Sequence, residues 1–343
     1  MPLITYQEVI KSLNKKKREK HLLLGNGFSQ AYDSKIFSYN ALSDFVAETE
    51  DELLQKLFNV INTTNFETVM SHLDIFYKLA LEFLEDKKLA KKILKAKGSL
   101  KDNLINAISE LHPEHVFKIP EKASRKCATF LGEYLYNGGN VFTTNYDLLL
   151  YWVLMKNKDE LENICDGFGK EYIEKDEYDP DFESEFGDLE WGPNQADQHI
   201  YYVHGALHIF DTGVSIEKEI YEEDYLLTNI KKRIDKKEYP VFVTAGDGKQ
   251  KLAHILHNPY LDYCYKQLST ITGSLVAFGF GFGKYDSHIV EAINKAAKQK
   301  KDRLWSIYIG VYSKKDEKYI TSIASKLKCK KVYLFDSKTA SIW

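Results

Sequence analysis

The order of apolar and polar positions predicts strands that alternate with helices. Seven short apolar runs have the length of strands, and several are continuously apolar: 21–25, 139–143, 200–204, 240–244, 273–281, 303–311 and 331–335. Continuous apolar runs are typical of strands that are covered on both faces, as in a parallel sheet. Helical patterns separate several of the runs, for example over 285–300 and 314–327. The sequence therefore predicts an α/β fold with a Rossmann-like, doubly wound, mostly parallel sheet.

Two long segments interrupt this alternation. Residues 41–135 show helical periodicity almost throughout, which is too long for one crossover, so we predict an inserted helical layer. Residues 156–199 are acidic and rich in Pro, Gly and Tyr, and we predict an irregular surface insertion there. A length of 343 residues suits one large domain or two modest ones. We interpret residues 1–343 as a single domain that carries these two insertions.

Composition and charge narrow the class of protein. Hydrophobic residues make up 44% of the chain and charged residues 28%, which is typical of a globular protein. The net charge of −3 gives no general attraction to nucleic acid or to anionic lipid, so we expect neither partner. The longest apolar run, 148–155, is too short to span a bilayer, and we expect a cytoplasmic protein. The four cysteines lie far apart without a C-x-x-C pair, which predicts neither disulfides nor structural zinc.

The first apolar run ends in Gly25-Asn26-Gly27, and Ser29 and a helical pattern follow. A strand that ends in Gly-x-Gly before a helix is typical of an anion site. Glycine lets the backbone approach a ligand, and free N–H groups at the helix start point at phosphate. The third glycine of the dinucleotide fingerprint is missing, and no P-loop lysine follows. An ordinary strand-to-helix turn is the alternative interpretation.

The second run ends in short polar side chains, within Thr143-Thr144-Asn145-Tyr146-Asp147. The carboxyl ends of parallel strands line the ligand crevice of such folds, so Asn145 and Asp147 are candidate site residues. Capping of the helix predicted over 147–155 would also account for Asp147. It would leave Asn145 unexplained.

The run 200–204 ends in His204-Gly205. A single histidine is more often structural than catalytic. Its position at a strand end, beside a glycine that leaves room for a ligand, makes His204 a candidate. His208 completes an H-x-x-x-H pattern, but no nearby Glu or Cys completes a set of metal ligands, so we expect no metal.

The run 273–281 ends in alternating glycines, and Asp286 follows ahead of a helix. Asp286 is expected to be an N-cap that accepts bonds from the helix amides. Capping does not explain Gly279, Gly281 and Gly283, which remove side chains along one side of the strand end, as a bulky ligand requires. A ligand contact is therefore predicted here.

In their order along the chain, these four segments resemble the motifs of the SIR2 (sirtuin) superfamily. Sirtuins carry Gly-Ala-Gly-x-Ser, Thr-Gln-Asn-Ile-Asp, His-Gly and Gly-Thr-Ser; the matching stretches here are 25–29, 143–147, 204–205 and 279–283. More closely, the chain resembles bacterial SIR2-like proteins of the DUF4917 type. These share LLLGNGFS, a TNFE-like stretch (64–67), FTTNYD, HGALH, HNPYLDYCY and a late FG-x-x-x-x-x-x-D-x-H-I. The resemblance covers most of the chain.

The resemblance implies an NAD site. Asn145 is suited to hold a water or a ribose hydroxyl, and His204 to act as a base, because the ordinary pKa of histidine lies near neutrality. Asp147 would accept a bond from the nicotinamide carboxamide, and the 25–29 elbow would hold the pyrophosphate. The residues predicted to contact NAD besides the catalytic Asn145 and His204 are Gly25, Asn26, Gly27, Phe28, Ser29, Thr144, Asp147, Gly279, Gly281 and Asp286.

Departures from the sirtuin pattern favour hydrolysis over protein deacylation. The paired zinc cysteines and the Pro-Asp-Phe-Arg stretch are absent, and Gly281 replaces the serine of the late motif. Because the zinc module helps to build the acyl-peptide groove, the resemblance implies that NAD is the substrate and is cleaved to nicotinamide and ADP-ribose. Bacterial anti-phage SIR2 effectors, which act by abortive infection, have this activity.

The resemblance also bears on partners. We expect a homo-oligomer, because SIR2-like effectors often work as oligomers or beside a partner ATPase or nuclease, and the sequence identifies no such partner. Two alternatives stay open. The same pocket would serve a sensor that binds NAD or ADP-ribose without turnover, or the chain would be mainly an assembly subunit.

Overall fold

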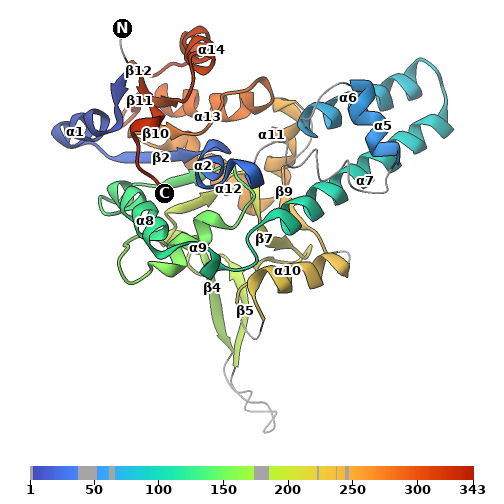
Figure 1. Cartoon of the computed structure of the whole chain (residues 1–343), viewed down its shortest axis with the longest axis horizontal. Helices are drawn as coiled ribbons and strands as arrows, with labels where there is room; N and C mark the ends of the chain where they lie inside the picture. Colours follow the sequence, from blue (N-terminus) through green and yellow to red (C-terminus); the bar gives the residue numbers. More distant parts are fainter. Residues whose placement is uncertain are drawn as a thin grey trace.

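A computed structural model describes residues 3–37, 52–61, 66–173, 185–221, 224–236, 238–243 and 247–343. Its centre is a parallel sheet of seven strands in the order β1-β12-β11-β10-β2-β3-β6 (Figure 1). The strands are β1 (Ile4–Thr5), β2 (Lys20–Leu24), β3 (Val141–Thr143), β6 (Ile200–Tyr202), β10 (Gly273–Phe278), β11 (Leu304–Val311) and β12 (Lys331–Asp336). The predicted α/β class and the doubly wound, parallel sheet are confirmed.

Burial on both faces explains why these strands read as continuous apolar runs. Every residue of β2 and β3 is buried, and only the first residue of β10 is partly exposed. Helices cover the sheet from opposite sides, with α8 (Glu121–Leu135) on one face and α13 (Ser287–Ala297) on the other (Figure 1). The helix α1 (Tyr6–Lys16) lies beside α8, and α12 (Pro259–Thr270) lies beside α13.

The strand order reverses between β2 and β10, which lie side by side at the centre of the sheet. From β2 the chain continues to β3 and β6 in one direction, and from β10 to β11 and β12 in the other. The connections that follow β2 and β10 therefore diverge to opposite faces. In open α/β sheets this switch point leaves a crevice at the carboxyl ends of the strands, where ligands bind.

A second, antiparallel sheet has the order β4-β5-β8-β7-β9. Its strands are β4 (Phe168–Ile173), β5 (Glu185–Trp191), β7 (Gly205–Asp211), β8 (Ile216–Lys218) and β9 (Pro240–Phe242). Two predictions are corrected here. The run 240–244, expected within the parallel alternation, forms β9, which pairs antiparallel with β7; residue 244 lies outside the described residues. The segment 156–199, expected to be irregular, contributes the paired strands β4 and β5.

The predicted helical layer begins with α5 (Glu52–Ile61), α6 (Phe66–Glu82) and α7 (Lys87–Leu111). These helices pack around a small core of their own, made by Phe58, Val69, Met70, Leu73 and Leu100. The first residues of the predicted insertion, 41–51, lie outside the described residues. Its last helix, α8, differs from the prediction, because it packs on the parallel sheet and contributes to the main core. The apolar face of α8 meets β2 and β3, as a crossover helix requires.

The remaining helices connect these parts. They are α2 (Gly27–Tyr32), α3 (Ser34–Phe37), α9 (Leu149–Lys156), α10 (Leu226–Asp235), α11 (Gly248–His257) and α14 (Lys314–Ala324). Short 3₁₀ turns span Val116–Lys118, Gln195–Asp197, Lys284–Asp286 and Ser337–Thr339. All four cysteines are free thiols. Among the described residues, no helix is long and apolar enough to cross a membrane.

Candidate functional site

A cavity of about 930 Å³ lies at the carboxyl ends of the central strands. Its volume is at the upper end of the range for small-molecule sites. The segments that follow β2, β3, β6, β10, β11 and β12 all contribute to its wall. Nine of the predicted site residues line it: Asn26, Gly27, Thr144, Asn145, Asp147, His204, Gly279, Gly281 and Asp286. The sheet topology thus brings together residues that are far apart in the sequence.

Three polar side chains form a buried chain of hydrogen bonds behind the cavity wall. The Ser29 hydroxyl donates to Asp147 Oδ2 at 2.5 Å, and Asn145 Nδ2 donates to Ser29 Oγ at 2.8 Å. Asp147 Oδ1 accepts from the N–H of Leu149, the first residue of α9, although Leu148 and not Asp147 occupies the N-cap position. Because Ser29 gives its only proton to the carboxylate, it must accept from Asn145, and this fixes the amide orientation.

That orientation leaves Asn145 Oδ1 as an acceptor without a partner among the described residues. The side chain is deeply buried, and only 8% of the residue is exposed. Buried polar atoms in native proteins are nearly always hydrogen-bonded, so an orphaned acceptor on a residue that lines a cavity indicates a place for a ligand or water. Asn145 Oδ1 is itself inaccessible, so a ligand reaches it only with a small movement of the side chain. The backbone of this segment is held by neighbouring strands, because Thr144 N donates to Leu24 O and Val203 N donates to Thr143 O.

Ser29 and Phe28 do not line the cavity, in contrast to the prediction. Ser29 is fully buried, and its hydroxyl is used by Asp147 and Asn145. Phe28 is a core residue whose ring lies 5.0 Å from the ring of Trp343. Asp147, predicted to bind a carboxamide, lies in the wall with both oxygens already accepting bonds. The structure therefore gives Ser29 and Asp147 a role in orienting Asn145.

The glycine elbow, residues 25–29, packs against the end of β10. The N–H groups of Gly25 and Gly27 donate to the carbonyls of Phe278 and Gly279, and the Phe28 N–H donates to Gly25 O. A Cβ built on Gly25 would lie 2.6 Å from Phe280 Cα, and one on Gly27 would lie 2.6 Å from Gly279 Cα. These three amides are engaged within the protein and are not free to hold phosphate, although Asn26 and Gly27 line the cavity. The two glycines let the ends of β2 and β10 cross closely.

The later glycines differ among themselves. Gly279 has a φ of +67°, and a Cβ there would lie 2.5 Å from Phe28 N, so it belongs to the same backbone crossing. Gly281 lines the cavity and has open space around the position of a Cβ. The predicted reason for the glycine run, room for a ligand, therefore fits Gly281, while Gly279 is required by the backbone.

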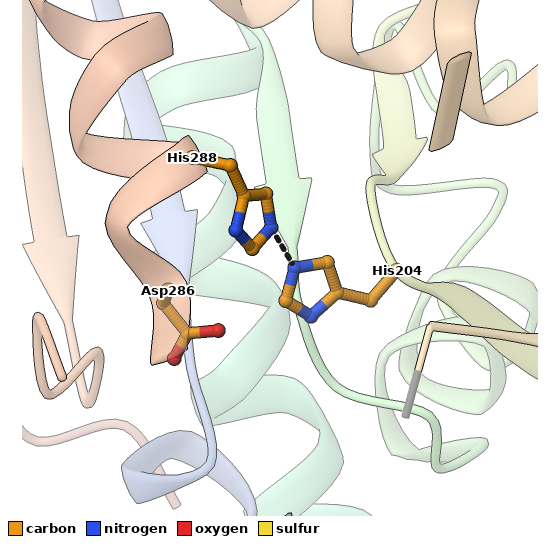
Figure 2. Close-up of side chains that lie close together, drawn as sticks. All are labelled: His204, Asp286 and His288. Atoms are coloured by element: carbon orange, nitrogen blue, oxygen red, sulfur yellow. Dashed lines mark hydrogen bonds between the residues drawn. The ribbon is translucent and has the colours of Figure 1, made fainter. Parts of the chain in front are cut away.

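His204 lies in the wall beside a second histidine that we did not predict, His288 in the first turn of α13. Their Nε2 atoms are 2.8 Å apart, and both residues are buried (Figure 2). His208, the other member of the H-x-x-x-H pattern, lies apart from this pair and stacks on Tyr151. Asp286 completes a cluster in which a ligating atom of each residue lies within 4.8 Å of the others.

Asp286 occupies the N-cap position of α13, but its side chain makes no bond to the helix amides, so the predicted capping is wrong. Instead, Lys251 Nζ on α11 lies 3.1 Å from Asp286 Oδ1, and the Lys251 side chain is completely buried. The start of α11 approaches α13 closely, because a Cβ on Gly248 would lie 1.9 Å from Ser287 Oγ. This approach brings the ammonium group to the carboxylate.

Burial keeps both histidines neutral at pH 7. It lowers the pKa of His204 well below its usual range, and the charge that His288 carries when protonated and the Lys251 ammonium act in the same direction. It also lowers the pKa of His288 to about 4, although the Asp286 carboxylate opposes this shift. Burial has the opposite effect on Asp147: it raises the pKa of the carboxyl group, and the hydrogen bond from Ser29 offsets only part of this rise. A neutral imidazole can accept a proton.

Part of the cavity wall consists of aromatic and charged side chains. Tyr285, Tyr312 and Tyr319 line it, together with Asp316 and Lys338. The Lys338 ammonium stands 4.8 Å from the centre of the Tyr312 ring. Such a wall offers flat rings for stacking and a cation for an anionic group.

Sequence reasoning missed His288 and Lys251. Asp286-x-His288 at a strand-to-helix junction was a usable signal, since the spacing places both side chains near the carboxyl end of β10. Lys251 had no local signal, because its approach depends on how α11 packs against α13.

Comparison with known proteins places most of the chain, including the site, in one family. A family model described as a domain of unknown function, DUF4917, matches residues 22–343. The chain belongs to the DUF4917 family. That part of the predicted resemblance is confirmed, and the matched range includes every residue of the cavity wall. No curated protein matches the chain. The family description carries no activity, so the wider relationship to the SIR2 superfamily stays a prediction.

Proposed function

We propose that this chain is a SIR2-like NAD glycohydrolase that cleaves NAD to nicotinamide and ADP-ribose. One observation carries the proposal: Asn145, whose buried Oδ1 lacks a hydrogen-bond partner among the described residues, and His204, whose imidazole is neutral, line the same cavity at the carboxyl ends of adjacent strands. An acceptor and a base beside a large cavity are the groups that hydrolysis of an N-glycosidic bond requires.

The chemistry needs little from the protein. The bond between the ribose C1′ and the nicotinamide nitrogen breaks, and nicotinamide leaves as a neutral molecule from a cationic ring. The ribose carbon passes through an oxocarbenium-like state, and the oxygen of a water forms the new bond to C1′. Asn145 Oδ1 would accept a hydrogen bond from this water or a ribose hydroxyl, and His204 would take the released proton.

The rest of the cavity supports a dinucleotide ligand. Its wall offers Tyr285, Tyr312 and Tyr319 as surfaces for the adenine ring and Lys338 as a cation for the pyrophosphate. This assignment replaces the engaged amides of the glycine elbow as the phosphate contact. The resemblance to bacterial SIR2-like effectors extends the proposal to anti-phage defence in an oligomeric protein. A metal is not part of the proposed reaction.

The test is to incubate the purified protein with NAD and follow nicotinamide release by chromatography, while calorimetry measures NAD affinity. His204→Ala should lower turnover by ~10²–10⁴-fold, because a positioned base is lost. Asn145→Ala should also lower turnover strongly while NAD still binds, because the orphaned acceptor acts mainly on the transition state. Loss of binding and turnover in equal measure would make Asn145 a binding group only.

A matched control is Asn157→Ala. Asn157 is as buried as Asn145, but its amide bonds Ser124 and the Val153 carbonyl, outside the cavity. This change should lower stability and leave the turnover of the folded protein unchanged. If the wild-type protein binds NAD but releases no nicotinamide, including when assembled, the chain is a sensor and the proposal is wrong. If it does not bind NAD at all, the assembly role remains.

A further inference from the structure

His204 and His288 share one proton between their facing ring nitrogens. Two bare Nε2 atoms 2.8 Å apart would repel each other through their lone pairs, and two protonated ones would clash through their hydrogens. One nitrogen must therefore donate and the other accept. Since burial keeps both rings neutral, each ring carries one proton, and the two tautomers are linked: fixing one fixes the other.

The surroundings decide which tautomers form. Asp286 lies beside the two rings, within 4.8 Å of a ligating nitrogen of each, and its negative charge favours the protonated form of His288 (Figure 2). His288 Nδ1 has no hydrogen-bond partner among the described residues, and the nearby negative charge of Asp286 favours a proton on it. On this assignment His288 carries its proton on Nδ1 and presents a bare Nε2 to His204. His204 then donates from Nε2, and its Nδ1 is bare.

The bare nitrogen of His204 is the one that a ligand can use. Figure 2 shows Nδ1 of His204 pointing away from His288, and His204 lines the cavity. With Nε2 occupied by His288, only Nδ1 remains to take a proton from water or a ribose hydroxyl. The opposite tautomer would present an N–H donor to the cavity and could not act as a base.

We propose that His288 is a positioning residue that sets the tautomer of His204 and accepts its second proton, so that the two histidines act as one base. The proposal rests on the proposed function for its kinetic part. When His204 Nδ1 takes a proton from the attacking water, the Nε2 proton moves to His288 Nε2. His204 ends neutral, and the positive charge resides on His288, beside the Asp286 carboxylate.

Transfer of the proton to His288 compensates for the weakness of His204 as a base. A base whose pKa is far below the working pH is weak, and burial makes His204 such a base. Transfer of the charge to His288 moves it toward Asp286, which favours the protonated ring. Lys251 pairs with the same carboxylate and limits this gain, so the relay is balanced between one negative and one positive neighbour.

A metal ion is the competing interpretation, because two imidazoles and a carboxylate are a common set of ligands. Two facts disfavour it. Nitrogens bound to one tetrahedral zinc lie about 3.3 Å apart, which follows from bonds of about 2.0–2.1 Å, and here they are closer. The fully buried Lys251 ammonium already pairs with Asp286 Oδ1 at 3.1 Å, so a divalent cation would compete with it for the carboxylate.

Two variants separate the two parts of the proposal. In His288→Gln, the side-chain oxygen can accept from His204 Nε2–H, so the tautomer is kept but the second proton has no acceptor. In His288→Leu, both functions are lost. We expect His288→Leu to lower kcat by ~10²-fold with little change in KM, because a wrong tautomer disables a catalytic histidine. His288→Gln should recover part of that loss.

A spectroscopic measurement tests the pair without any substrate. In protein labelled with ¹⁵N in the histidine rings, long-range ¹H–¹⁵N correlation spectra distinguish protonated from bare ring nitrogens. At pH 7 we expect His204 as the Nε2–H tautomer and His288 as the Nδ1–H tautomer, with His204 unchanged in His288→Gln. Finding His204 as Nδ1–H, or either ring cationic, would overturn the proposal.

The outcomes are distinguishable from those of the proposed function. If the wild-type protein releases no nicotinamide, the NAD hydrolase proposal fails, and the spectra still decide the tautomers. If the wild-type protein is active and both His288 variants keep wild-type kcat, the positioning role fails alone. One tightly held divalent metal per chain, lost together with activity on chelation, would make the pair metal ligands and overturn the relay.

Discussion

Each of the two sheets borders a buried ion pair between a lysine and an aspartate, and the two pairs differ in what surrounds them. In the antiparallel sheet, Lys218 Nζ lies 2.6 Å from Asp166 Oδ2, and both side chains are nearly inaccessible. The ammonium stands over the rings of Tyr151 and Phe168, at 5.4 and 5.0 Å. Side chains of the fold itself thus enclose this pair.

At the carboxyl edge of the parallel sheet, Lys251 is equally buried, but its partner Asp286 keeps 22% of its side chain exposed and lines the cavity. Two neutral histidines and the orphaned Asn145 Oδ1 share this edge. Buried polar groups that are closed on all sides stabilise or specify a fold, whereas those that face a cavity are available to a ligand. The comparison predicts that the antiparallel pair serves stability and the cavity pair serves both stability and chemistry.

The largest expected effect comes from breaking the enclosed pair. Asp166→Asn leaves the Lys218 ammonium buried without a counter-charge, and removal of one partner from a buried pair costs ~3–5 kcal/mol. The free energy of unfolding should fall by that amount in urea titrations, while the turnover of the folded protein stays at the wild-type value. As a control, Asp224→Asn breaks the exposed pair with Lys232 and should cost under ~1 kcal/mol.

The matched change at the cavity is Asp286→Asn. It also removes a negative charge from beside a buried lysine, so stability should fall, at the lower end of the same range because Asp286 is partly hydrated. Here turnover should fall as well, since His288 loses the carboxylate that favours its protonated form. If Asp286→Asn and Asp166→Asn change both the free energy of unfolding and turnover alike, the proposed difference between the two ion pairs is wrong.

The next effect separates two glycines of the cavity edge. Gly281→Val should weaken NAD binding at least tenfold, or about 1.4 kcal/mol, because the new side chain enters open space in the wall. Stability should stay within ~0.5 kcal/mol. Gly279→Ala should instead destabilise the fold, since its φ of +67° and the nearby Phe28 N leave no room. Calorimetry and urea unfolding measure the two effects; a Gly281→Val protein that binds NAD normally would place the ligand elsewhere.

The parallel sheet was predictable because its strands are buried on both faces and read as continuous apolar runs. The strands β4 and β5 were not, because their sequences, FGKEYI and EFGDLEW, mix charged with apolar residues. In an acidic context this resembles an irregular loop, and only pairing within the second sheet makes them strands. The run that became β9 was identified as a strand, but its sheet was wrong, since pairing partners are set by tertiary contacts.

The candidate site was predictable only where position along a strand determines function. Asn145 and His204 follow β3 and β6 directly, so sheet topology alone brings them to one edge. Gly25 and Gly27 were misread, because the pattern shows that a small residue is needed but not whether a ligand or a backbone occupies the space. Lys251 was missed because its contact with Asp286 joins residues 35 positions apart through helix packing.

The smallest expected effect is on the pH dependence of stability. It concerns one buried histidine at the cavity and one in the antiparallel sheet, and it tests whether burial lowers the pKa of both. His288 at the cavity and His208 in the antiparallel sheet are both buried, and burial lowers the pKa of both, to about 4 for His288. An unfolded histidine titrates near 6.5. Between pH 4 and 6.5 the unfolded chain therefore binds more protons, and the free energy of unfolding falls as the pH is lowered.

At pH 5, a histidine with a folded-state pKa of about 4, such as His288, contributes a slope of ~1.2 kcal/mol per pH unit. Urea unfolding between pH 5.0 and 6.5 should show a reduced slope in His288→Gln and also in His208→Leu, although only the first change lowers turnover. An unchanged slope in His288→Gln would mean that His288 carries a proton in the folded state, and the neutral pair with His204 would then be wrong. An unchanged slope in His208→Leu would mean that burial does not lower the pKa of His208. It would not bear on the neutral pair of His204 and His288.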